Sequence, residues 1–89
     1  MTESEWIIEL QNDGYSNLLF CDGIPGRYED EHVHDRDHKM VIFYGDVEIT
    51  MGYQTVHLGA HDYLEIPSGT NHTSMIGVEG CRYVIAERF

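Results

Sequence analysis

Two short segments decide how this sequence is interpreted: HVHDRDH at residues 32–38 and PSGTNH at residues 67–72. Together they hold four of the six histidines in the chain. Because residues i and i+2 of an extended strand point to the same face, His32 and His34 can aim their imidazoles at one point. A three-residue turn then brings His38 round at the start of the next strand. Neutral imidazole is the commonest protein ligand of transition metals, so the pattern predicts a site for a divalent ion.

Length and composition predict one small domain. Of the 89 residues, 42% are hydrophobic, which is enough to build a core. A chain of this size buries only a modest core, so a bound metal or a dimer partner would stabilise it by binding only the folded state.

The charge balance narrows the possible partners. The chain has 16 acidic and 5 basic residues, a net charge of −11. Nucleic acid and anionic membrane surfaces are bound mainly through Lys and Arg, so we expect neither as a partner. The first five residues are polar, and no long apolar run follows. We therefore expect no signal peptide, no membrane span and a cytoplasmic location.

The two cysteines, Cys21 and Cys81, lie far apart in the sequence and match neither a zinc ribbon nor a redox motif. The simplest interpretation is two reduced, buried thiols in a cytoplasmic protein. A disulfide or a reactive thiol stays open as an alternative.

Short apolar runs interrupted by glycine turns predict an all-β protein, either a sandwich or a barrel. No stretch has the pattern of an amphipathic helix of useful length. The expected strands are Trp6–Leu10, Tyr15–Phe20, Tyr28–His34, His38–Tyr44, Val47–Met51, Gln54–Leu58, Tyr63–Ile66, His72–Ile76 and Arg82–Glu87.

The spacing of the first histidine segment matches a known motif. Gly26 is followed by five residues and then by His32 and His34; His38 comes three residues further on, and Gly45 six residues after that. This resembles the first motif of the cupins, in which a glycine, five residues, His-x-His, three or four residues, a glutamate, six residues and a glycine follow one another.

The second segment resembles the second cupin motif. Pro67, Gly69 and His72 match its Pro-x-Gly-x-x-His core, and Asp62 and Ile66 fit the positions that lead into the proline. The two motifs together span residues 26–72. The resemblance implies an antiparallel jelly-roll barrel, the double-stranded β-barrel of the cupins.

Three positions depart from the family pattern. His38 stands where most cupins have glutamate, which resembles the four-histidine subset of small cupins; His61 replaces an opening glycine and Ile76 a closing asparagine. Four neutral ligands leave more positive charge on the ion, which favours an anionic substrate or a metal-bound hydroxide. Imidazole donors fit Mn, Fe, Ni, Zn or Cu, and the metal's identity stays open. The expected metal ligands are His32, His34, His38 and His72.

Each histidine and acidic residue near the site also has an alternative role. His38 could instead lie outside the ligand set, with water in its place on the metal. His57 and His61 lack ligand spacing. The acidic run at residues 29–37 could hydrogen-bond the second ring nitrogens of the ligands or simply form a solvated face.

We expect a mostly apolar cavity beside the metal. Tyr28 lies four residues before His32, so it would share the ligands' face and could act as a general acid or hydrogen-bond donor, although a core position is the simpler role. Cys81 shares a face with Tyr83 and could also reach the cavity. The residues expected to line the cavity are Met40, Ile42, Val47, Ile49, Leu64, Ile66, Ser74 and Tyr83.

Three functions fit these expectations. The resemblance implies a metal-dependent enzyme, a dioxygenase or isomerase, acting on a small oxyanionic or carbonyl substrate. A binding or sensing module for a sugar or acid is the alternative, and a purely structural metal is the third possibility. Outward-facing Val41 and Phe43 predict an apolar contact between two copies, so we expect a homodimer.

Overall fold

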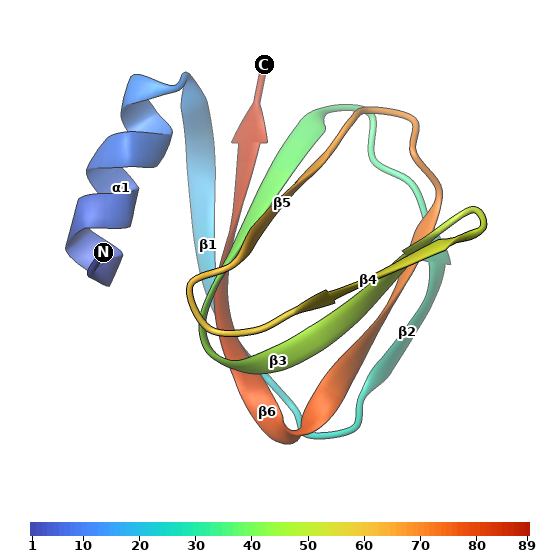
Figure 1. The fold of residues 1–89 in the computed structure, drawn as a ribbon. Coiled ribbons are helices and arrows are strands. Elements are labelled where there is room, and N and C mark those ends of the chain that lie inside the picture. Colours follow the sequence, from blue (N-terminus) through green and yellow to red (C-terminus); the bar gives the residue numbers. More distant parts are fainter.

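The computed structural model describes all residues, 1–89, and contains one helix and six strands (Figure 1). The all-β prediction is confirmed, because strands dominate and pair antiparallel throughout. The elements are α1 (Glu3–Asn12), β1 (Tyr15–Gly23), β2 (Tyr28–His32), β3 (Asp37–Met51), β4 (Gln54–Leu58), β5 (Tyr63–Ile66) and β6 (His72–Arg88).

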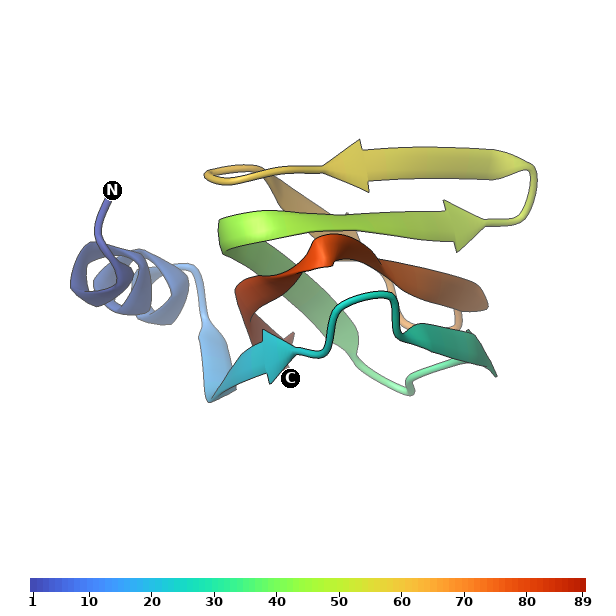
Figure 2. The same ribbon diagram turned by 90° about the horizontal axis from the view of Figure 1, so that it is seen from below.

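Two long strands, β3 and β6, pair antiparallel along most of their length. Each contributes to both layers of the barrel wall and so connects them. The first half of β3 pairs with β5 and with the end of β6, which in turn pairs with β1. The second half of β3 pairs with β4 and with the start of β6, which pairs with β2. The bend of both long strands therefore closes two four-stranded layers around one interior, as the two views show (Figures 1 and 2).

The bends of β3 and β6 lie at two glycines, where the sequence pattern predicts turns between separate strands. Gly45 has φ of +75° and Gly80 has φ of +82°, and a Cβ on Gly45 would collide with the carbonyl oxygen of Gly80. The pairing register of β3 with β6 shifts on both sides of this point. The expected strand breaks between Tyr44 and Val47 and between Ile76 and Arg82 are therefore wrong: β3 and β6 bend there without ending.

The expected strand Trp6–Leu10 is also wrong, because this segment belongs to α1. Thr2 caps the helix: its hydroxyl accepts from the Glu5 backbone N–H, and the Glu5 carboxylate accepts from the Thr2 N–H. This reciprocal pair is a capping box, a signal that the sequence contained. No helix in the structure is long and apolar enough to cross a membrane.

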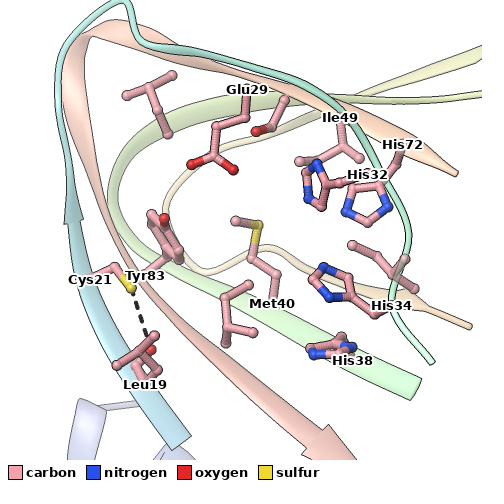
Figure 3. A pocket seen from close by; sticks show the side chains of 14 residues that line it. Leu19, Cys21, Glu29, His32, His34, His38, Met40, Ile49, His72 and Tyr83 are labelled. Carbon is pink, nitrogen blue, oxygen red and sulfur yellow. Dashed lines mark hydrogen bonds between the residues drawn. The ribbon is translucent and has the colours of Figure 1, made fainter. Parts of the chain in front are cut away.

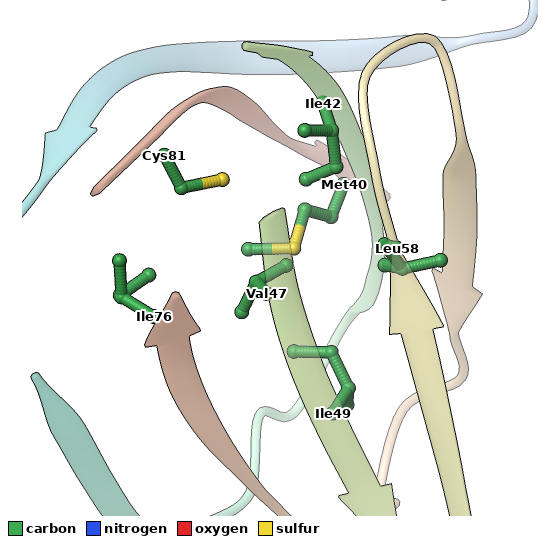
Figure 4. Close-up of a cluster of buried hydrophobic side chains, with 7 residues drawn as sticks. All are labelled: Met40, Ile42, Val47, Ile49, Leu58, Ile76 and Cys81. Carbon is green, nitrogen blue, oxygen red and sulfur yellow. The ribbon is translucent and has the colours of Figure 1, made fainter. Parts of the chain in front are cut away.

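Two hydrophobic clusters support the fold. One lies inside the barrel (Figure 4) and consists of Met40, Ile42, Val47, Ile49, Leu58, Ile76 and Cys81. The other lies between α1 and the outer face of the sheet and consists of Trp6, Leu10, Tyr15, Val41, Val84 and Ala86. Val41 is therefore covered by the helix, and the prediction that it is exposed for a dimer contact is wrong.

Candidate metal centre

The pairing of β2 with β6 brings the two histidine segments together. His32 ends β2 and His72 begins β6; the two residues are register partners, and their ring centroids lie 4.1 Å apart. His34 follows in the link to β3, and its ring centroid lies 5.2 Å from that of His32 and 5.4 Å from that of His72. Residues forty positions apart in sequence thus form one cluster (Figure 3).

Local hydrogen bonds orient two of these rings. Nδ1 of His32 lies 2.8 Å from the carbonyl oxygen of Asp30, and Nδ1 of His72 lies 3.0 Å from that of Thr70. A carbonyl only accepts, so each Nδ1 carries the proton and each Nε2 keeps its lone pair. The backbone, two residues earlier in each case, therefore sets the tautomer that binds a metal. Of the two roles considered for the acidic run at residues 29–37, hydrogen bonding to the second ring nitrogens is therefore not found for His32 and His72.

The surroundings of the cluster lower the pKa of two of its imidazoles, those of His34 and His72. Burial lowers the pKa of His34, and the neighbouring imidazoles of His38, His32 and His72 lower it further. Burial also lowers the pKa of His72, against a smaller opposite effect of its hydrogen bond to Thr70. Because the neutral ring is the metal-binding form, both shifts favour ligation near neutral pH.

His38 lies beside the cluster but faces another partner. Its ring centroid is 4.2 Å from that of His34, and its Nδ1 lies 2.9 Å from the carbonyl oxygen of Arg36. Its Nε2 lies 3.4 Å from a carboxylate oxygen of Glu87, the register partner of His38 on β6. Asn17 donates to the other oxygen of that carboxylate at 3.0 Å. The sequence offered no signal for Glu87, because only strand pairing brings it here.

Three histidines therefore form the group that could hold a metal. The ligand nitrogens of His32, His34 and His72 all lie within 4.8 Å of one another. Three nitrogen donors, from β2, β6 and the link between β2 and β3, suit a divalent transition ion, and three protein ligands are the number typical of catalytic sites. His38 is not part of this group, so the four-histidine set predicted from the sequence is not confirmed.

A cavity of about 340 Å³ opens beside the cluster. Five of the residues expected to line it do so: Met40, Ile49, Ile66, Ser74 and Tyr83. The expectation is wrong for Ile42 and Val47, which belong to the buried cluster with Ile76 and Cys81 (Figure 4), and for Leu64, which packs against the same cluster.

Tyr28 is not at the site. The register of β2 with β6 shifts between Glu29 and His32, where two residues of β2 oppose one residue of β6. This bulge reverses the alternation, so Glu29 lines the cavity while Tyr28 is 53% exposed outside it. The prediction that Tyr28 shares the ligands' face is wrong, since it assumed an unbroken strand.

The bulge also explains one of the cavity residues that the sequence pattern missed. Glu29 lines the cavity although it is exposed to solvent, and its carboxylate lies between Tyr83 and the histidines in Figure 3. Tyr83 and Cys21 lie on the side of the cavity away from the histidines. Both cysteines are free thiols; Cys81 is buried, which raises its pKa to about 11. The missed lining residues are Leu19, Cys21, Glu29, Ile76 and Ile85.

Comparison with known proteins supports the fold. No protein-family model matches the chain, and no curated protein matches it by sequence. Among solved structures, a cupin-2 domain protein from Shewanella frigidimarina NCIMB 400 superposes with a TM-score of 0.73 at 26% identity, covering 86% of this chain and 72% of that one.

Two enzymes share the fold at lower identity. Oxalate decarboxylase from Bacillus subtilis, which has Mn(II) centres, matches with a TM-score of 0.76 at 20% identity, over 92% of this chain and 23% of that chain. The DMSP lyase DddQ from Ruegeria pomeroyi DSS-3 matches with a TM-score of 0.70 at 23% identity, over 81% of this chain and 36% of that chain. This chain thus spans only about a quarter of the decarboxylase and about a third of the lyase.

These findings confirm the fold expected from the two sequence motifs. The chain is a β-barrel of the cupin fold with a histidine cluster in its interior. It is similar to cupin-2 domain proteins, and its candidate site combines three histidines with an adjoining, mostly apolar cavity.

Proposed function

We propose that the chain is a metal-dependent enzyme, of dioxygenase or isomerase type, that acts on a small molecule through an oxyanion or a carbonyl oxygen. One observation carries this proposal: the three imidazoles open directly onto the 340 Å³ cavity. A cavity of this size suits a small substrate, and its position beside the nitrogen donors gives that substrate access to a bound ion.

The number of donors supports catalysis over a purely structural metal. Structural sites are usually closed by four protein ligands, whereas catalytic sites keep a position for water or substrate. His38, the fourth candidate, has its Nε2 directed at Glu87. Three donors beside open space therefore match the catalytic arrangement better.

A divalent ion held by these residues would polarise a substrate oxygen or lower the pKa of a bound water. The chain supplies the surroundings for that chemistry. The backbone carbonyls of residues 30 and 70 hold two imidazoles in their binding tautomer. Apolar side chains such as Met40 and Ile49 limit the water around the substrate. Burial raises the pKa of Tyr83 to about 12, so its hydroxyl keeps its proton and can donate a hydrogen bond.

A non-catalytic binding or sensing module for a small sugar or acid is the second candidate. The observation that favours it is the scarcity of proton-transfer groups in the cavity. Apart from the histidines, the lining offers one carboxylate, one thiol, one serine and a phenol whose pKa is about 12. Retention of a small molecule without its conversion would distinguish this candidate from the enzyme.

The test of the metal assignment is elemental analysis of the protein purified without added metal. We expect about one equivalent of a transition metal, and we expect the variant His34→Ala to lose most of it. His57→Ala is the matched control, because His57 lies outside the cavity and pairs with Asp46 and Glu48. Equal losses in the two variants would contradict the proposed site, and the analysis also identifies the metal among Mn, Fe, Ni, Zn and Cu.

A further inference from the structure

The two ends of the cavity differ in chemistry. The histidine cluster lies on one side, and the hydroxyl of Tyr83 and the thiol of Cys21 lie on the other (Figure 3). The carboxylate of Glu29 lies between them in this view, on a solvent-exposed part of the lining. Met40, an apolar side chain of the lining, lies between Tyr83 and the histidines in this view. A molecule that fills the cavity therefore meets nitrogen donors on one side and a single carboxylate on the exposed part of the lining.

The charge of the lining is one-sided. No lysine or arginine lines the cavity, and Glu29 is the only carboxylate among its 14 residues. An anionic group beside Glu29 would lie next to a like charge, with no Lys or Arg in the lining to compensate it. Glu29 is exposed to solvent, which weakens this repulsion without removing it. A cationic group there gains a charge-assisted hydrogen bond to the carboxylate. The net charge of −11 also favours the approach of cationic ligands from solution.

We propose that the ligand of this cavity is a small molecule with two unlike ends, an oxyanion or carbonyl oxygen directed at the histidines and an ammonium or other cationic group directed at Glu29. This inference rests on the proposed function, because the histidine end needs a bound metal to attract an oxyanion. It excludes dicarboxylates that span the cavity as preferred ligands.

This inference is tested with three small-molecule probes. They share a carboxylate at one end and differ in the group at the other end. β-Alanine, butyrate and succinate all present a carboxylate on two methylenes, and they end in an ammonium, a methyl and a second carboxylate. Their binding is measured on the full chain loaded with cobalt(II), whose visible spectrum reports a ligand entering its coordination shell. We expect β-alanine to bind about tenfold more tightly than butyrate, and succinate to bind most weakly. The same series one methylene longer (γ-aminobutyrate, pentanoate and glutarate) tests a larger separation between the two end groups.

The variant Glu29→Gln removes the charge while it keeps the shape of the side chain. We expect it to retain cobalt, to lose the preference for β-alanine over butyrate, and to bind succinate better than the unmodified protein does. Glu31→Gln is the matched control, because Glu31 is on the same strand but accepts from Asn71 outside the cavity. This variant should keep the preference.

The outcomes separate this inference from the proposed function. If the unmodified protein takes up no cobalt, the proposed function fails and the inference fails with it. If cobalt binds but both series show no preference, or prefer the dicarboxylate, only the inference is overturned. The same holds if Glu29→Gln keeps the preference for the ammonium probe, or if it loses cobalt, since Glu29 would then support the metal instead of the ligand.

Discussion

The histidines at this site are positioned by very local contacts. His32, His38 and His72 each direct Nδ1 at the carbonyl oxygen of the residue two positions earlier, at distances of 2.8 to 3.0 Å. Such a contact needs only a suitable backbone conformation over three residues, so each segment carries its own orienting partner. What differs is the environment of Nε2: His38 has Glu87 beside it, whereas the other two belong to the cluster.

The pKa shifts of His34 and His72 predict how metal retention and stability depend on pH. Both pKa values are lowered from 6.5 in the folded protein, mainly by burial. Above about pH 6.5 both rings are neutral in the folded and unfolded states, so their contribution is fully present. As the pH falls further, the unfolded chain binds protons first, and the free energy of unfolding decreases until the folded-state pKa values are passed.

Metal retention should fall in the same direction, because protons compete for the Nε2 lone pairs. The check is metal content after dialysis at a series of pH values from about 8 to about 4.5. We expect full retention at the upper end and steep loss below about pH 6.5. Retention that stays flat over this range would contradict ligation by histidine.

Gly45 is the residue on which the bend of β3 depends, and its substitution is expected to be costly. An alanine there needs positive φ, and its Cβ collides with the backbone of Gly80. We expect Gly45→Ala to lower the free energy of unfolding by about 3 kcal/mol. Gly52→Ala is the control: φ is also positive, at +60°, but no atom lies within 4 Å of the added Cβ. Its expected cost is about 1 kcal/mol, and urea denaturation should resolve the difference.

At the scale of elements, α1 acts as a cover for the outer face of the sheet. Leu10, on α1, is fully buried in the cluster that includes Val41, Val84 and Ala86 of the sheet. Ile8 on the same helix is 60% exposed. We expect Leu10→Ala to cost about 3 kcal/mol and Ile8→Ala less than about 0.5 kcal/mol in the free energy of unfolding. Similar effects of the two substitutions in urea denaturation would mean that the helix does not pack on the sheet in solution.

The bulge in β2 is the element that decides which side chains reach the site. With regular alternation, Tyr28 would face the cavity and Glu29 would face outward. The bulge between Glu29 and His32 reverses this arrangement, so a carboxylate takes the place of a phenol in the lining. Tyr83, on β6, is the phenol that lines the cavity instead.

At the scale of the whole molecule, a bound metal should stabilise the fold substantially. The cluster joins β2, β6 and the link between β2 and β3, so the site exists only when these segments are assembled. A free metal concentration 100-fold above the dissociation constant contributes about 2.7 kcal/mol. For a domain of this size we expect a rise in Tm of roughly 10–20 °C.

Thermal unfolding with and without added zinc measures this rise. His72→Ala should abolish it, and His57→Ala should keep it, because only His72 belongs to the cluster. A rise of the same size in both variants would indicate that zinc stabilises the protein at another place.

The homodimer and the cytoplasmic location stay predictions. The structure removes Val41 from the expected dimer surface, because α1 covers it, and Phe43 packs at the edge of the same cluster. Light scattering on the purified chain would determine the number of copies directly.

The sequence by itself determined the β class, the two cupin motifs and the histidines of the cluster. Their spacing could be interpreted because it depends on short-range geometry: alternation along a strand and glycine at positions of tight backbone approach. The capping box of α1 was equally local, and the helix could have been predicted from Thr2 and Glu5.

Only the tertiary structure decided which of these residues share the cavity. A single bulge in β2 exchanged Tyr28 for Glu29, and strand pairing placed Glu87 from the far end of the chain beside His38. It also buried Ile42 and Val47 in the core, outside the lining of the cavity. Bulges and register arise from contacts between distant strands, so no pattern within one segment can reveal them.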